Sequence, residues 1–124
     1  MKLEVAPGAR ADIHSTATVG ADSRIQVIAG ALEIGADAVL GDGCVIVVRH
    51  GVRVGAAARL GDRVVLIDFG PSLDDVDRPV RQQPLRTAPI TIGDGAIIGH
   101  GSVLEAGASV PPRTRVPEHT VVSA

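Results

Sequence analysis

The chain has 124 residues, the length of one domain, and its 12 Lys and Arg against 14 Asp and Glu give a net charge of −2. This balance argues against a nucleic-acid-binding surface, which needs an excess of basic residues. Hydrophobic residues make up 45% of the sequence but aromatic residues only 1%, so a core has to be built from small aliphatic side chains.

The single Cys excludes a disulfide within the chain, which suits a reducing compartment. No apolar run is long enough for a signal peptide or a membrane-spanning helix. We therefore expect one domain over residues 1–124, located in the cytoplasm, with neither a membrane nor a nucleic acid as its partner.

From residue 13 onward, the sequence repeats an aliphatic residue every six positions. The stretches IGADAVLGDGCV (34–45) and IGDGAIIGHGSV (92–103) each hold two consecutive copies. The spacing shifts near residues 26–28 and 50–53 and stops between residues 66 and 92. Gly often follows the aliphatic residue, and a small residue stands four positions after it. The aliphatic positions are Ile13, Val19, Ile25, Ile28, Ile34, Leu40, Ile46, Val54, Leu60, Leu66, Ile92, Ile98, Leu104, Val110, Val116 and Val122.

A period of six predicts short β-strands joined by tight corners, since a helix would repeat every three or four residues and a simple strand every two. Three such strands form one triangular coil of roughly 18 residues, and successive coils stack as parallel strands about 4.8 Å apart. Gly or Asp at the corners accommodates a positive φ. The sequence predicts an all-β fold, a parallel β-helix of five to six coils with one protruding loop. A β-sandwich of short strands is the alternative.

One segment, about residues 68–90, interrupts the repeat. It contains Asp74, Asp75 and Asp77 and several prolines. Long loops inside compact domains are typically functional, which makes this segment the first place to look for a site. The stretch that follows, QQPLRTAPITIGDGAIIGHGSVL (82–104), is the most specific pattern in the chain.

These patterns resemble the hexapeptide-repeat acyltransferase family, in particular its O-acetyltransferases of sugars and small molecules. The resemblance covers nearly all of the chain and rests on the repeat, on Asp68 followed by acidic residues and Pro, and on the stretch 82–104. It implies a left-handed β-helix, acetyl-CoA as the acyl donor, and a homotrimer. It also implies sites in the clefts between neighbouring prisms, beside the interrupting loop.

The chain departs from the family pattern at the residue that acts as general base. Where relatives carry a His in the loop, this chain has Phe69, and where they often carry a second His, it has Pro71. A phenyl ring cannot take a proton from an acceptor hydroxyl. Ile97 replaces the family's Trp before the Ile-Gly pair, which alters a surface that would pack against the cofactor.

Two other residues are candidates for the catalytic role. His100 lies where the family resemblance implies a path for the cofactor, and the alternative is that it is a solvated surface residue. Asp68 in the loop is the second catalytic candidate. His50, supplied by a neighbouring subunit, is a further alternative for the base.

Four residues are candidates for binding the cofactor. Arg86, close to the end of the loop, could pair with the negative groups of CoA or of a substrate. Gly99, His100 and Gly101 lie on the implied cofactor path. We expect no metal: the γ-class carbonic anhydrases share the predicted fold and bind zinc through three His, but the pair of His five residues apart that they use is missing here.

The expected function is transfer of an acyl group from acetyl-CoA to a hydroxyl or amine of a small molecule, with a sugar as one candidate acceptor. The alternative is a catalytically inactive trimeric scaffold or ligand-binding module of the same fold.

Overall fold

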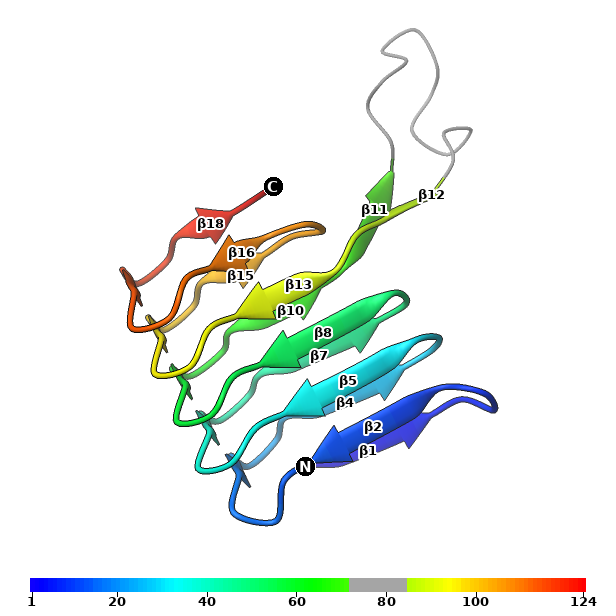
Figure 1. Cartoon of the computed structure of the whole chain (residues 1–124), viewed down its shortest axis with the longest axis horizontal. Coiled ribbons are helices and arrows are strands. Elements are labelled where there is room, and N and C mark those ends of the chain that lie inside the picture. The colour runs from blue at the N-terminus through cyan, green and yellow to red at the C-terminus, as the bar shows by residue number, and fades with distance from the viewer. Residues whose placement is uncertain (72–84) are drawn as a thin grey trace, which may run out of the picture.

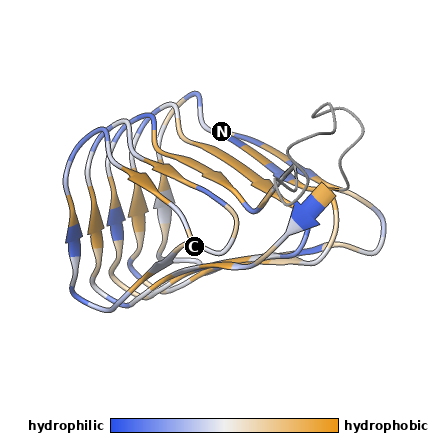
Figure 2. Ribbon diagram, turned by 90° about the horizontal axis from the view of Figure 1, so that it is seen from above, coloured by the Kyte–Doolittle hydropathy of each residue, from blue (hydrophilic) through white to orange (hydrophobic). Residues whose placement is uncertain are grey.

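The computed structural model describes residues 1–71 and 85–124, which form a left-handed parallel β-helix of about five turns. Each turn, called a coil below, contributes one strand to each of three parallel sheets, so that the coils stack as a three-sided prism (Figures 1 and 2). The first and last strands lie at opposite ends of the stack (Figure 1). The fold predicted from the six-residue period is therefore confirmed. Within the described ranges there is no helix that could cross a membrane.

The three sheets are called A, B and C, in the order in which the chain visits them. Along the stack, sheet A consists of β1 (Lys2–Val5), β4 (Arg24–Val27), β7 (Val45–Val48), β10 (Val65–Ile67), β15 (Val103–Leu104) and β18 (Val121–Val122). Sheet B consists of β2 (Arg10–Ile13), β5 (Ala31–Ile34), β8 (Gly51–Val54), β13 (Ile90–Ile92) and β16 (Ser109–Val110). Sheet C consists of β3 (Thr18–Val19), β6 (Val39–Leu40), β9 (Arg59–Leu60), β14 (Ile97–Ile98) and β17 (Arg115–Val116).

Alternate side chains of each strand fill the inside of the prism. In β4, Ile25 and Val27 are buried while Arg24 and Gln26 face solvent. Burying one such aliphatic side chain contributes about 1.5 to 3 kcal/mol, so the stacked interior is the main source of stability. Nearly all of the predicted aliphatic positions lie inside. The prediction that Ile28 points inward is wrong, because Ile28 is 38% exposed in a corner and Val27 takes the inward position.

The coils have different lengths before and after the interruption. In the early coils, Ile13 pairs with Ile34 and Ile34 pairs with Val54, so each of these coils is longer than three hexapeptides. After the interruption, Ile92 pairs with Val110, which is the spacing of three hexapeptides. The predicted coil length therefore holds only for the later coils. The early coils are longer because their strands in sheets A and B have four residues each, which accounts for the two shifts in the sequence spacing.

The chain turns at three kinds of corner, named A–B, B–C and C–A after the sheets that they join. At the C–A corners (20–23, 41–44, 61–64, 99–102 and 117–120) the third residue, not the first, has a positive φ, for example +69° at Gly43. The first residue, such as Gly41, is needed for a different reason. A Cβ on Gly41 would lie 2.7 Å from the carbonyl carbon of Gly61 in the next coil and would also meet the Asp62 carboxylate. Where Gly follows the aliphatic residue, as at Gly41, it thus allows neighbouring coils to approach closely.

Cys44 fills one of the small-residue positions inside a C–A corner. Its side chain is 1% exposed, and its Sγ lies 3.3 Å from the Gly61 carbonyl oxygen, to which it donates. Burial raises the pKa of the Cys44 thiol above its ordinary value of 9.0. Because the thiolate is the reactive form, this residue is a core thiol and not a nucleophile.

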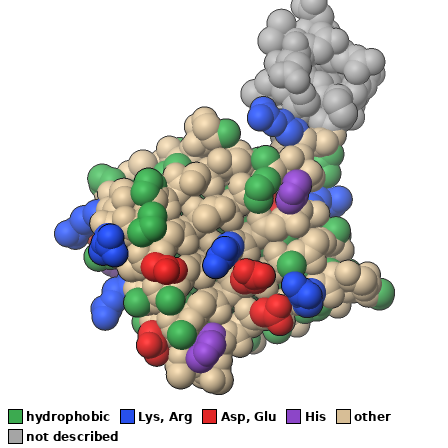
Figure 3. Space-filling model, viewed as in Figure 1, with side chains coloured by type: hydrophobic (Ala, Val, Ile, Leu, Met, Phe, Trp, Pro, Cys, Tyr) green, Lys and Arg blue, Asp and Glu red, His purple; other side chains and the backbone are tan. Residues whose placement is uncertain are grey.

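The outer faces of sheets A and B differ in polarity. Sheet B, which faces the viewer in Figure 3, carries a row of charged side chains of both signs that includes Asp12, Glu33 and Arg53. The outer face of sheet A is polar in β1 and β4, but it becomes aliphatic in the later coils. The outward residues there are Val45, Val47, Val65, Ile67, Val103 and Val121.

Candidate functional site

The chain leaves the prism at the A–B corner that follows β10 and returns to the same corner before β13. Two short strands, β11 (Phe69–Pro71) and β12 (Leu85–Thr87), pair in antiparallel fashion at the base of this excursion (Figure 1). The Asp68 carbonyl accepts a hydrogen bond of 3.0 Å from the Ala88 N–H, which closes the corner behind them. The acidic residues Asp74, Asp75 and Asp77 lie outside the described residues.

Asp68 holds the preceding A–B corner together. Its carboxylate is fully buried and accepts three hydrogen bonds of 2.8 Å, from the backbone N–H groups of Arg49, His50 and Gly51. Both carboxylate oxygens are engaged. The geometry therefore gives Asp68 a structural role, while its predicted catalytic role stays a prediction.

The A–B corner of the preceding coil shows which backbone acceptor the Asp68 side chain replaces. There, the N–H groups of Ile28 and Ala29 donate to the backbone carbonyl of Val48 in the next coil, at 2.8 and 3.3 Å. At the equivalent corner, residues 49–51, the N–H groups do not donate to a backbone carbonyl of the next coil, because the chain turns outward after Ile67. The Asp68 side chain supplies the acceptor in place of backbone, which matters because a buried N–H left unpaired is strongly unfavourable.

Phe69 is the residue that the sequence resemblance places at the family's catalytic His. The Arg49 guanidinium lies 4.8 Å from the centroid of its ring, a distance at which a cation and an aromatic face attract each other. His50 is close by, with its Nδ1 3.4 Å from the Thr87 hydroxyl oxygen. Arg49 was not singled out by the sequence analysis, since nothing in the six-residue pattern marks it as a neighbour of the loop.

A hollow of about 600 Å³ lies on the other side of the excursion's base. Its walls are mainly apolar, and they include the ring of Phe69 and the outward side chains Ile67 and Val103. Two charged residues, Arg86 and Glu105, also border it. The complete lining is Ile67, Phe69, Gly70, Arg86, Val103, Leu104, Glu105, Ala106, Ser123 and Ala124. Arg86 borders this hollow, and its predicted role in cofactor binding stays a prediction. Glu105 was missed because it occupies an ordinary outward position after Leu104.

The other predicted cofactor residues lie elsewhere. Gly99 and His100 border a second hollow of about 760 Å³ on the outside of sheet C, together with Arg59 and Arg115. Gly101 belongs to the same C–A corner. Within one chain, the structure therefore places Asp68 and Arg86 at one corner of the prism and residues 99–101 at another, with sheet A between them.

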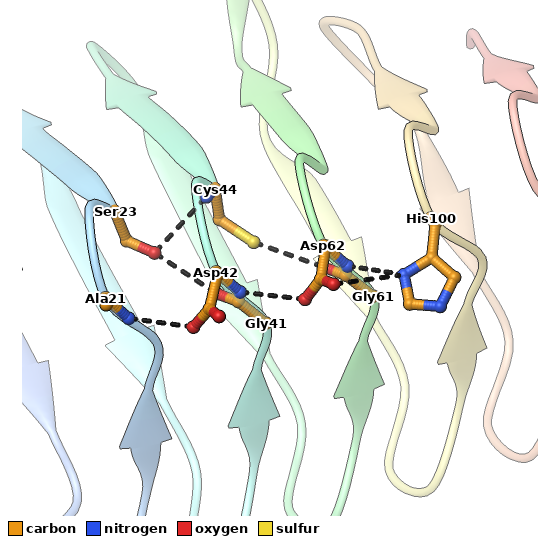
Figure 4. Close-up of polar contacts among 8 residues, drawn as sticks. All are labelled: Ala21, Ser23, Gly41, Asp42, Cys44, Gly61, Asp62 and His100. Carbon is orange, nitrogen blue, oxygen red and sulfur yellow. Dashed lines mark hydrogen bonds and ion pairs between the residues drawn. The ribbon is translucent and has the colours of Figure 1, made fainter.

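His100 belongs to a row of side chains that link successive C–A corners (Figure 4). The Ala21 N–H donates to Asp42 Oδ1 at 2.9 Å, and the Asp42 N–H donates to Asp62 Oδ1, also at 2.9 Å. In the next step, the Asp62 N–H donates to Nδ1 of His100 at 2.7 Å. His100 thus takes the position that Asp holds in the coils before it.

This hydrogen bond determines which nitrogen of the neutral His100 ring carries the proton. Since Nδ1 accepts from a backbone N–H, the proton sits on Nε2. Nε2 then has no lone pair with which to take a proton from an acceptor. The observed arrangement suits a corner cap, and the predicted role of His100 as general base stays a prediction.

No group of three or more His, Cys, Asp or Glu within residues 1–71 and 85–124 is arranged to hold a metal ion.

No family model matches the chain, and no curated protein matches it by sequence. Its fold does match solved structures. A mutant of AntD, an N-acyltransferase from Bacillus cereus in complex with dTDP-4-amino-4,6-dideoxyglucose and coenzyme A, has a TM-score of 0.59 at 10% identity, over 98% of this chain and 75% of that one. AntD in complex with dTDP and 3-hydroxybutyryl-CoA has a TM-score of 0.57 at 11% identity, over the same shares of the two chains. These similarities, together with the strand topology, define the chain as a hexapeptide-repeat β-helix.

Proposed function

We propose that this protein is an acyltransferase that uses a CoA thioester, with acetyl-CoA as the expected donor, to acylate a hydroxyl or amine of a small molecule. A sugar is the acceptor class that we favour. The observation that carries the proposal is the hollow at the base of the excursion, where an apolar wall meets Arg86. The fold supports it, since the AntD structures with this fold contain CoA or an acyl-CoA and dTDP or a dTDP-sugar.

Arg86 is the residue that we assign to the phosphates of CoA. It is exposed, it lies on β12 at the rim of the hollow, and a guanidinium binds phosphate through paired N–H groups. The apolar walls beside it suit the uncharged arm of the cofactor. The role of residues 99–101 in cofactor binding requires a second copy of the chain.

We further propose that the protein is a homotrimer. The outer face of sheet A is aliphatic in its later strands, whereas sheet B presents the polar residues Arg53, Thr91 and Ser109 outward at these levels. An aliphatic outer face is typical of a sheet that is covered on both faces. Covering this face with a second copy would bring the C–A corner of one subunit towards the A–B corner of another. Such an arrangement would unite the two groups of predicted site residues that a single chain keeps apart.

A catalytically inactive trimeric scaffold or ligand-binding module is the second candidate function. It is favoured by a specific observation: Phe69 replaces the family's base, Asp68 is buried with three backbone partners, and His100 caps a corner through Nδ1.

Release of the CoA thiol from acetyl-CoA, measured with a panel of sugars and amino sugars, tests the proposal. Turnover supports the enzyme, and Arg86→Ala should then raise the KM for acetyl-CoA about tenfold because one phosphate contact is lost. The matched control is Arg53→Ala, which removes an exposed Arg from sheet B and should leave KM unchanged. No turnover and no thermal shift on adding CoA would favour the scaffold.

Sedimentation tests the assembly. The native chain should sediment as a trimer, and Val65→Asp should give monomers, because a carboxylate would be buried in the contact. Thr91→Asp, an outward position on sheet B, is the control and should leave the trimer intact. A native chain that sediments as a monomer would contradict the proposed assembly.

A further inference from the structure

The first coil leaves its part of the prism interior exposed to solvent. In the part of the chain that the structure describes, β1 is the outermost strand of sheet A and has a neighbour, β4, on one side only. Leu3 and Val5 occupy inward positions, because they pair with the buried Ile25 and Val27 of β4. Leu3 and Val5 are nevertheless 42% and 43% exposed, whereas their partners in β4 are each 1% exposed. An interior that is open in this way favours contact with another apolar surface.

The backbone of β1 also has groups available for a further strand. The Lys2 N–H donates to the Ser23 carbonyl at 2.8 Å, and the Ala6 N–H donates to the Val27 carbonyl at 2.9 Å. Backbone groups of successive residues in a strand point to opposite sides, so the N–H and C=O groups of Leu3 point away from β4. An edge of this kind is a template for pairing with another chain.

The outward charges of β1 determine which pairing of two copies is favourable. Lys2 and Glu4 both point outward, with Lys2 Nζ 3.4 Å from Glu4 Oε1. If two copies of β1 pair in antiparallel fashion, outward residues have to face outward residues, and the pairing centres on Lys2, Leu3 or Glu4. Centring on Lys2 or on Glu4 places like charges opposite each other, which is unfavourable. Centring on Leu3 places Lys2 of each copy opposite Glu4 of the other, so β1 is complementary to its own reversed copy.

The opposite end of the prism does not offer a matching surface. In sheet C, the Gly99 N–H donates to the Val116 carbonyl of the last coil at 2.8 Å. The residue that follows Val116 is Pro117, which has no N–H to donate to a further coil, and Pro111 takes the equivalent place after the last strand of sheet B. Val116 itself is only 8% exposed. Stacking the first coil of one copy on the last coil of another would therefore lack two of the hydrogen bonds that join coils.

We infer that two copies of this chain associate end to end through their first coils, about a two-fold axis that passes between the two Leu3 residues. β1 of each copy pairs with β1 of the other, so that Leu3 faces Leu3, Lys2 faces Glu4, and the apolar Met1 faces Val5. The contact is isologous and closes after two copies, because the same surface of each copy is used. A trimer would become a hexamer. The excursion leaves the prism at a later coil, away from this contact (Figure 1).

Sedimentation of the full chain tests the association. Leu3→Asp places a carboxylate in the apolar contact and should halve the sedimenting mass, whether the unit that pairs is one chain or a trimer. Pro112→Asp, at an exposed position of the opposite end, is the control and should keep the native mass. Equal masses for the native chain and Leu3→Asp would overturn the inference.

Exchanging the charges tests the pairing without changing an apolar residue. Lys2→Glu and Glu4→Lys alter exposed side chains, and each alone places like charges opposite each other in the contact. Each should raise the dissociation constant of the end-to-end contact about tenfold or more. An equal mixture of the two variants places opposite charges together again and should bind as the native chain does, as should the double variant. Glu33→Lys on sheet B is the control and should leave the constant unchanged. Native binding by the separate variants, or weak binding by their mixture, would overturn the inference.

Discussion

Backbone hydrogen bonds join successive coils at both the C–A and the A–B corners, and the C–A corners add side-chain acceptors to them. At the C–A corners, a side chain of one coil accepts a hydrogen bond from the backbone of the coil before it, as Asp42, Asp62 and His100 do in turn. At the A–B corner of residues 28–30, the acceptor is a backbone carbonyl of the next coil. The corner at residues 49–51 is different, because there the Asp68 side chain accepts the hydrogen bonds. In the preceding coil a backbone carbonyl accepts them.

This difference shows how a regular solenoid can be interrupted without losing its interior. The hydrogen bonds of a coil depend on the coil above, so the coil below an excursion is left with unpaired backbone groups. One buried carboxylate with three N–H partners satisfies that corner. A substitution there should therefore have a larger effect than a substitution at any single C–A corner, where the links repeat.

The largest effect is expected at Asp68. Asp68→Ala leaves three partly buried N–H groups without their acceptor and should lower the free energy of unfolding by about 2 to 4 kcal/mol. Asp68→Asn keeps one oxygen as acceptor and should lose about half as much. Urea unfolding followed by circular dichroism measures both values. The control is Asp12→Ala, an exposed carboxylate that pairs with Arg10 at 3.3 Å, for which we expect a loss below about 0.5 kcal/mol. A loss below about 1 kcal/mol for Asp68→Ala would contradict the assigned role.

The second prediction compares the loss of stability on substituting two glycines of one C–A corner, Gly41 and Gly43. Gly41→Ala places a Cβ against the backbone of Gly61 and should lower the stability by about 2 to 3 kcal/mol through overpacking. A Cβ at Gly43 would meet only the Cγ atom of Arg63, at 3.4 Å, so Gly43→Ala should lose about 1 kcal/mol, which is the penalty of a positive φ. Thermal unfolding of the two variants side by side gives the comparison. The reverse order would contradict the explanation that the close approach of neighbouring coils requires Gly at the first position of the corner.

The smallest effect is expected at His100. His100→Ala removes one acceptor at a partly exposed corner and should lower the stability by about 1 kcal/mol. His100→Asp restores the residue type of the preceding coils and should be as stable as the native chain. Equal melting temperatures for His100→Ala and His100→Asp would contradict the link with Asp62. Because His100→Asp removes the imidazole and keeps the corner, it also separates a structural role from a catalytic one.

The fold could be predicted because its main determinant is a spacing. Inward residues such as Ile98 and Val116 lie one above the other, and the interval of three hexapeptides between them produces that stack directly. The lengths of the early coils and the position of Ile28 could not be predicted from the same interval. They depend on how much chain an A–B corner holds, and the strands on either side of it can lengthen without exposing the core.

The candidate site could be predicted only in part. The location of the excursion and the position of Arg86 beside it followed from the break in the repeat. The structural role of Asp68 depends on contacts with the preceding coil, whose residues are 17 to 19 positions away in the sequence, and the residues beside Asp68 do not indicate them. His100 shows the same limit, because its spacing marks an outward position and only the structure reveals the Asp62 N–H bound to it.

The direction of the sheet hydrogen bonds has a mechanical consequence. Every strand of sheets A, B and C bonds only to the strands of the coils above and below it, so these bonds run along the axis of the stack. Tension applied between the two ends would load the outermost coil first and peel it away before the next one bears force. A single molecule stretched in this way should lengthen in a series of small steps at low force, one for each coil, like a ribbon unwound from a spool.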